Sequence, residues 1–249
     1  MNEVISTLLN HRSIRHFEEK PLTDEQIKTI VACAQSASTS SYIQAYSIIG
    51  IKDKEKKKKL AAIAGEQAYV ANNGHFFVFC ADLHRHEVIG ELEHKDVIPS
   101  IESTEKFMAA IIDAALAAQN AAAAAESMGL GICYIGGIRN NLEEVKKLLK
   151  TPERVIPLFG MAIGYPAKIT DKKPRLPFEH VYHENEYEQD EGVFVEQLEE
   201  YNNITSSYYE NRTGGSRKDQ WTEQIARMLE KKSRMYMKEF VQKNKLDLR

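Results

Sequence analysis

The stretch from Phe107 to Leu130 constrains the fold of this chain more than any other segment, because it is apolar on nearly every side of a helix. About half of it is alanine, whose small side chain lets neighbouring backbones approach closely. Asp113 and Glu126 interrupt it, and alanine inserts only weakly into a bilayer. We therefore expect a central helix over about 107–128, buried on most sides, in a soluble protein with no membrane span.

Charge and cysteine content exclude several classes of protein. The chain has 249 residues and a net charge of −3, so nothing in its balance indicates a nucleic-acid-binding surface. Met1–Asn10 lacks the basic start of a secretory signal. Three widely spaced cysteines without a CxxC pair indicate neither a disulfide framework nor a zinc site, and they fit the cytoplasm. His84 and His86 have no HExxH or cysteine-rich partner, so we predict no metal site.

Hydrophobic periodicity and turn residues predict an α+β fold. Helices are expected over 2–10, 23–37, 53–64, 107–128, 142–149 and about 220–243, and strands over 46–52, 76–81, 132–135 and 155–165. No repeat or linker divides the chain, so we expect a single domain over 1–249 with a C-terminal helical extension from about 196. Residues 84–105 have no clear pattern, and we expect them to line the entrance of a site.

Three basic segments have the chemistry to hold phosphate. In the first, two guanidinium groups stand beside an imidazole and a hydroxyl, which together suit a phosphate dianion: His11, Arg12, Ser13 and Arg15. In the second, Lys173 and Arg175 alternate in an extended, proline-flanked segment and can point the same way. Each segment alone is more often surface charge, but two rigid basic segments in an acidic chain make a shared anion more plausible.

The third basic segment surrounds Gly214 and Gly215, which predict a mobile loop. Arg212, Arg217 and Lys218 could clamp a second phosphate there, or they could be solvated surface. The lysines at 56–59 are interpreted as a solvated helix face, because no aromatic residues interleave with them.

The residues Tyr134, Ile135, Gly136 and Gly137 close a predicted buried strand. Glycines at that point let the backbone approach a flat ligand, although an ordinary tight turn would have the same pattern. The order helix then strand rules out a dinucleotide fingerprint. The Ser/Thr run at 38–41 and Gln67 can supply hydrogen bonds to a heteroaromatic edge. No nucleophile signature appears, so we assign no catalytic side chain and expect the chemistry to be carried by a cofactor.

Taken together, five motifs resemble the larger, NADPH-preferring branch of the oxygen-insensitive nitroreductases and flavin reductases. They are HRSIRHF at 11–17, the Ser/Thr run followed by Gln44, GLGICYIGGIRNN at 129–141, LFGMAIGYPA at 158–167 and KPRLP at 173–177. The resemblance spans nearly the whole chain. It implies a central, mostly antiparallel sheet flanked by helices, and an intertwined homodimer with FMN at the interface.

The resemblance also implies roles for individual residues. The 11–15 segment would hold the phosphate and ribityl chain of FMN, with Lys173 and Arg175 on the phosphate. Thr39, where relatives more often have serine, and Gln67 would bond the ribityl chain or ring edge. Residues 134–137 would pack against the isoalloxazine ring. Arg212 and Arg217 would take the 2′-phosphate of NADPH, and the use of NADH stays open because this loop differs in sequence.

The implied activity is hydride transfer from NADPH through bound FMN to a flat, electron-poor acceptor such as a nitroaromatic, a quinone or free flavin. A site shared by donor and acceptor predicts ping-pong kinetics. Two alternatives remain at this point. One is a dedicated NAD(P)H:FMN reductase that supplies reduced flavin, and the other is a flavin-binding redox sensor without turnover. Arg15 is the candidate for the group that stabilises reduced flavin.

Overall fold

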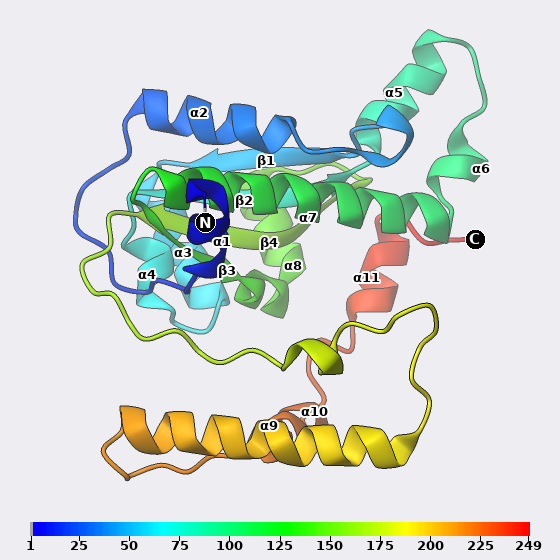
Figure 1. The fold of residues 1–249 in the computed structure, drawn as a ribbon. Coiled ribbons are helices and arrows are strands. Elements are labelled where there is room, and N and C mark those ends of the chain that lie inside the picture. Colours follow the sequence, from blue (N-terminus) through cyan, green and yellow to red (C-terminus); the bar gives the residue numbers. More distant parts are fainter. Residues whose placement is uncertain (1) are drawn as a thin grey trace. The chain divides into compact units, whose positions relative to one another are not determined.

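The computed structural model describes residues 2–249 and has the expected α+β architecture (Figure 1). The strands are β1 (Tyr46–Ile51), β2 (His75–Asp82), β3 (Gly131–Ile135) and β4 (Val155–Gly164). The α-helices are α1 (Glu3–Leu9), α2 (Asp24–Gln35), α3 (Lys54–Ile63), α4 (Ala68–Ala71), α5 (His84–Leu92), α6 (Ile98–Ile101), α7 (Thr104–Ser127), α8 (Leu142–Leu149), α9 (Glu191–Arg212), α10 (Trp221–Glu230) and α11 (Met237–Lys243). Three short 3₁₀ helices are η1 (Ser40–Tyr42), η2 (Gly136–Asn140) and η3 (Phe178–His180).

The four strands form one antiparallel sheet in the order β1-β2-β4-β3, which confirms the expected sheet. Successive side chains of a strand point to opposite faces, so the apolar run of β2 supplies two cores. Phe77 and Phe79 pack with α2 and α7 on one face. Phe76 and Val78 pack with α3 and α8 on the other face. The sheet is therefore covered by helices on both sides, and β2 is buried along its whole length.

The alanine-rich helix α7 lies against the sheet as predicted, but only one of its faces is buried. The buried positions include Ala110, Ala114 and Ala118, which recur at the helical spacing. On the opposite face Met108, Ile112 and Leu116 are exposed, at 52%, 48% and 44%. The expectation of burial on most sides is therefore wrong for this chain. By length and composition α7 could cross a membrane, yet its alanine face forms part of the core.

Local capping signals place the ends of two helices where the sequence predicted them. Thr23 and Gln26 form the expected reciprocal capping box at the start of α2. After α7, Gly129 adopts a φ of +75°, and the N–H of Leu130 donates to the carbonyl of Ala125 at 3.1 Å. Glycine takes this left-handed conformation without a steric penalty, so α7 ends there and β3 begins directly afterwards.

The chain divides into two compact units, each described by itself. One consists of residues up to Thr170 together with 234–249, and the other is the segment 171–233, called here the arm. The single helix expected over about 220–243 is wrong, because Lys231 is extended and Arg234 has a φ of +54°. Its apolar residues serve different units: α10 belongs to the arm, whereas Phe240 of α11 is buried in the first unit.

The C-terminal segment is fastened to the first unit by specific contacts. Tyr236 accepts a hydrogen bond from the N–H of Leu142 at 3.0 Å, and Phe240 is 3% exposed. The guanidinium of Arg154 donates to the carbonyl of Lys245 at 2.6 Å. The chain therefore leaves the first unit after Thr170 and returns to it at α11.

The lysine run at 56–59 is not uniformly solvated. Lys57 is buried, and its ammonium donates to the side-chain and main-chain oxygens of Asn73 at 2.8 and 3.2 Å. Burial, with a contribution from Lys54, lowers its pKa to about 8. One of the four lysines therefore lies under α3 rather than on its solvent face, because position 57 falls on the stripe that also buries Leu60 and Ala61.

Candidate functional site

The cationic segment 11–17 lies alongside β3. The N–H of Ile14 donates to the carbonyl of Ile132 at 2.8 Å. The side chain of Ile14 fills the space beside Gly131, where an added Cβ would lie 2.5 Å from its Cγ1. Farther along, the N–H of Glu18 donates to the carbonyl of Tyr165 at 2.9 Å. The basic segment is therefore held by a main-chain bond and a close fit at Ile14, and by a second main-chain bond just beyond its C-terminal end.

Two residues of this segment meet side chains from β3 and α4. Arg15 and Ser13 lie close enough to these side chains to act on them: Arg15 lowers the pKa of both the Tyr69 phenol and the Cys133 thiol, and Ser13 lowers that of Cys133. The Tyr69 hydroxyl also donates to Oε1 of Gln67 at 2.8 Å. Burial raises the pKa of both Tyr69 and Cys133, against the opposing charge of Arg15. The structure thus brings Ser13, Arg15 and Gln67 together through Tyr69 and Cys133.

The glycines that follow β3 allow close backbone approach. A Cβ on Gly137 would lie 2.6 Å from the main-chain oxygen of Ala64, so a side chain does not fit there. The residues form the short helix η2 rather than the expected simple turn. The end of α3 lies against η2, and Gln67 follows it after a turn in which Gly65 has a φ of +89°. This packing brings Gln67 close to Gly136 and Gly137, which together are called here the glycine corner.

Tyr134 is the half-exposed residue of an otherwise buried strand, with 37% of its surface open. Its ring meets Phe159 edge-on at a centroid distance of 5.7 Å. Its hydroxyl lies 3.4 Å from Oε1 of Gln119 on α7. Burial of the phenol, together with the charge of Glu126, raises its pKa. Tyr134 therefore offers a fixed aromatic surface beside the glycine corner.

His11 and Arg12 are each engaged by a neighbouring residue. His11 Nδ1 lies 2.7 Å from Oε1 of Glu126, near the C-terminal end of α7. The Arg12 guanidinium bonds the carbonyl of Asn10 at 3.0 and 3.1 Å and also contacts the Asn10 side chain. The imidazole is thus tied to the central helix, whereas Arg12 folds back on the segment that carries it.

Thr39 lies in a strained loop that is bound to α7 at Asp113, whereas His11 is bound to the same helix at Glu126. Ser41, Tyr42 and Gln44 all have φ between 47° and 59°, a conformation that non-glycine residues rarely adopt. Both oxygens of the buried Asp113 accept main-chain N–H groups of this loop, from Ser40 at 2.9 Å and from Ala45 at 3.0 Å.

The loop and the 11–15 segment are therefore anchored far apart in one protomer. Asp113 holds the loop and Glu126 holds His11, and these two residues are 13 positions apart, which corresponds to about 20 Å along α7. The structure does not bring Thr39 to the cluster around Arg15 within one chain.

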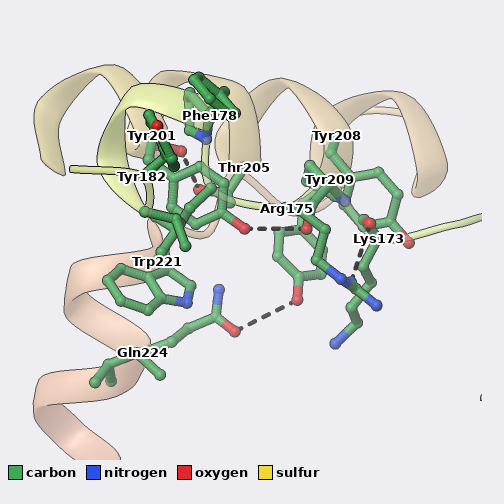
Figure 2. A pocket seen from close by; sticks show the side chains of 15 residues that line it. Lys173, Arg175, Phe178, Tyr182, Tyr201, Thr205, Tyr208, Tyr209, Trp221 and Gln224 are labelled. Carbon is green, nitrogen blue, oxygen red and sulfur yellow. Dashed lines mark hydrogen bonds between the residues drawn. The ribbon is translucent and has the colours of Figure 1, made fainter. Parts of the chain in front are cut away.

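Lys173 and Arg175 belong to the arm, where both are exposed. Their segment is extended as predicted, and the Arg175 guanidinium lies 3.3 Å from the carbonyl of Lys173. Both residues line a cavity of about 840 Å³ within the arm, and Figure 2 shows their side chains there. Tyr201 closes part of its wall by donating to the carbonyl of Pro174 at 3.0 Å, and Trp221 meets the Tyr201 ring edge-on at 5.4 Å.

The two arginines of the third basic segment also lie in the arm. Arg212 is the last residue of α9 rather than part of the loop, and its Nη1 donates to the Tyr208 hydroxyl at 3.0 Å. Arg217 lies over the ring of Tyr209 at 4.7 Å and forms an ion pair with Asp219. Both guanidinium groups are therefore stacked near one end of α9.

Four residues at the site were missed by the sequence reasoning: Tyr69, Cys133, Asp113 and Glu126. The two carboxylates carried a signal, since an acidic residue inside an alanine-rich helix has to find a partner when buried. Tyr69 and Cys133 carried none, because their proximity to Arg15 depends on how β3 and α4 pack. Among residues 2–249, no group of three or more His, Cys, Asp or Glu side chains is arranged to hold a metal ion.

Comparison with known proteins identifies the family of the chain. Residues 8–165 match the nitroreductase family, and residues 173–249 match the C-terminal domain of that family. This chain is a member of the nitroreductase family. A curated relative, FMN reductase (NADPH) from Bacillus subtilis, is 54% identical over 241 residues and covers 97% of each chain.

Solved structures of nitroreductase-family proteins agree with this assignment. NfrA1 from B. megaterium superposes with a TM-score of 0.98 at 66% identity, over 99% of this chain and 100% of that one. NADPH:FMN oxidoreductase from Vibrio harveyi, solved with NAD⁺, gives a TM-score of 0.89 at 38% identity and covers both chains fully. The nitroreductase fold therefore extends over the first unit and the arm.

Proposed function

We propose that this nitroreductase-family protein is an FMN-dependent NADPH oxidoreductase. The observation that carries the proposal is the convergence of Ser13, Arg15 and Gln67 beside the glycine corner at Gly136–Gly137. Bound FMN would accept hydride from NADPH and pass the electrons to a second substrate, so the protein needs no nucleophile of its own. Relatives named FMN reductase (NADPH) and NADPH-dependent oxidoreductase support this reading.

The residues of the first unit suit FMN chemically. His11, Arg12, Ser13 and Arg15 offer cationic and hydroxyl donors for the phosphate and ribityl chain. Gln67 supplies an amide for the ring edge, and residues 134–137 supply an aromatic side chain and a backbone surface without Cβ atoms. The Arg15 guanidinium would lower the energy of negative charge that develops on the ring during reduction, because a fixed positive charge needs no reorganisation.

We further propose that the working form is a homodimer. The separation of about 20 Å between the anchors of the Thr39 loop and of His11 leaves Thr39 outside the cluster of its own chain. A second copy would supply Thr39 to complete the site. The exposed face of α7, with Met108, Ile112 and Leu116, and the apolar side chains of the adjacent α1 support such an interface.

The arm would contribute the remaining contacts. In this proposal Lys173 and Arg175 bind the FMN phosphate, and Arg212 and Arg217 bind the 2′-phosphate of NADPH, with NADH as a weaker donor. The first unit and the arm would then act as one FMN-binding domain over 1–249, with a helical extension from about 196. The substrates would be small molecules, and the protein would act in the cytoplasm without nucleic acid or membrane partners.

Spectroscopy of the purified protein tests the proposal directly. Absorption peaks of oxidised flavin, bleached by NADPH without air and restored by an acceptor, are expected. Parallel initial-rate lines with varied NADPH and acceptor would indicate ping-pong exchange at one site. A protein that takes up no FMN and oxidises no NADPH would refute the proposal, and a flavin-loaded protein without turnover would indicate a redox sensor.

A dedicated FMN reductase is the second candidate, because the relative at 54% identity has that name. The values of kcat/KM for free FMN and for a nitroaromatic, measured with NADPH in excess, distinguish the two. A clear preference for FMN favours the reductase that supplies reduced flavin, and a preference for the nitroaromatic favours the broad nitroreductase.

A further inference from the structure

Glu126 has a location that is unfavourable for a carboxylate unless it is paired. It lies one residue from the end of α7, where the helix dipole disfavours negative charge. Its side chain is only 13% exposed and follows a run of alanines. Burial of a carboxylate is costly without a hydrogen-bonding partner. His11 supplies that partner, with Nδ1 at 2.7 Å from the Glu126 Oε1.

This contact fixes which atom of the imidazole is available for a ligand. A carboxylate can only accept, so Nδ1 carries a proton and donates it to Glu126. Nε2 is then the nitrogen left to meet a ligand of the 11–15 segment. A phosphate oxygen accepts hydrogen bonds, so a ring that binds phosphate through Nε2 donates from both nitrogens, one to Glu126 and one to the phosphate.

We propose that Glu126 is a positioning residue for phosphate recognition, which acts through His11 and makes the site discriminate FMN from riboflavin. This inference rests on the proposed FMN site. Glu126 would not touch FMN itself. It would orient the His11 ring by accepting the Nδ1 hydrogen bond, so that Nε2 is the nitrogen that donates to the phosphate. Arg12 is turned toward the neighbouring Asn10, whereas His11 is oriented by α7 through Glu126.

The test compares FMN with riboflavin, which has the same ring and ribityl chain but no phosphate. Dissociation constants for both flavins are measured on flavin-stripped protein by fluorescence quenching. Glu126→Gln keeps an acceptor but removes the charge, and Glu126→Ala removes both. We expect FMN to bind about tenfold more weakly to Glu126→Ala, with Glu126→Gln in between, because a hydrogen bond to a charged group is worth about 1.5 kcal/mol or more. Riboflavin affinity should not change.

Two further variants separate positioning from a general effect on the fold. In the His11→Asn background, Glu126→Ala should weaken FMN binding no further, since its effect passes through the imidazole. Glu105→Gln, an exposed acid in the first turn of the same helix, is the matched control and should leave both affinities unchanged. Equal weakening of FMN and riboflavin, additive effects in the double variant, or unchanged FMN binding would each overturn the inference. A wild-type protein that binds neither flavin would refute the proposed function itself.

Discussion

Replacement of Asp113 is the sharpest test of how the loop at 38–45 is held. Asp113 is 0% exposed, and its two oxygens accept the N–H groups of Ser40 and Ala45. Asp113→Ala leaves both donors without a partner, at a cost of about 1–3 kcal/mol each. Removal of a buried charge offsets part of that loss. We expect the free energy of unfolding to fall by about 3 kcal/mol.

Asp113→Asn should be intermediate, because its amide oxygen can accept one N–H while its NH₂ group opposes the other. The assay is urea unfolding followed by far-UV circular dichroism at several protein concentrations, because a midpoint that changes with concentration reveals a contribution from dimer dissociation. Thermal unfolding should shift by roughly 6–12 °C for Asp113→Ala in a chain of this size. The control is Glu105→Gln on the same helix. If Asp113→Ala unfolds at the wild-type urea concentration, the loop does not depend on this carboxylate.

Three further predictions concern pH, the glycine corner and loop strain. Burial, with the charges of Lys57 and Lys52, lowers the pKa of His75 to about 4. As pH falls below about 6.5, His75 is protonated in the unfolded state but stays neutral in the folded state. About 3 kcal/mol of the stability present at pH 7 should therefore be lost by pH 4. His75→Gln should flatten that part of the stability–pH curve, and a curve identical to that of wild type would contradict the prediction. Gly137→Ala should lower the free energy of unfolding by about 1–3 kcal/mol and weaken FMN binding, because the added Cβ would meet the main chain of Ala64. Calorimetry measures the stability and flavin titration the affinity. Unchanged values would count against the close approach. Tyr42→Gly should stabilise the fold by about 0.5 kcal/mol, because Tyr42 is 83% exposed and has a φ of 59°, a conformation that costs less for glycine. A loss of stability in urea would show that the Tyr42 side chain contributes packing.

The sequence predicted those parts of the fold that depend on local chemistry. The capping box at Thr23 and the left-handed Gly129 concern residues within a few positions of one another, and both are confirmed. The four strands follow from apolar runs that the sheet buries. The break between α10 and α11 could not be predicted, because Ile225 and Phe240 continue one helical stripe although they pack in different units.

The site was predictable where a residue type has a distinctive chemistry and less so where tertiary packing decides. The cations at 11–15 and the glycines at 136–137 are recognisable from the sequence, and their roles toward FMN stay predictions. The partners of those residues are not recognisable, since Tyr69 and Cys133 reach Arg15 and Ser13 only after β3 and α4 are packed. The separation between the Thr39 loop and His11 also depends on the length and straightness of α7, which no motif encodes.

The return of the chain to the first unit at α11 makes the arm an insertion tethered at both ends. After a single peptide-bond cleavage at Gly214–Gly215, each half of the arm would therefore stay covalently joined to a segment of the first unit. The fragment after the cut still contains α11, with Phe240 buried, and its Lys245 carbonyl is bonded to Arg154. A nicked protein of this kind would migrate as two pieces only after denaturation. The same double attachment means that Lys173 and Arg175 lie on a segment whose two ends are both joined to the first unit.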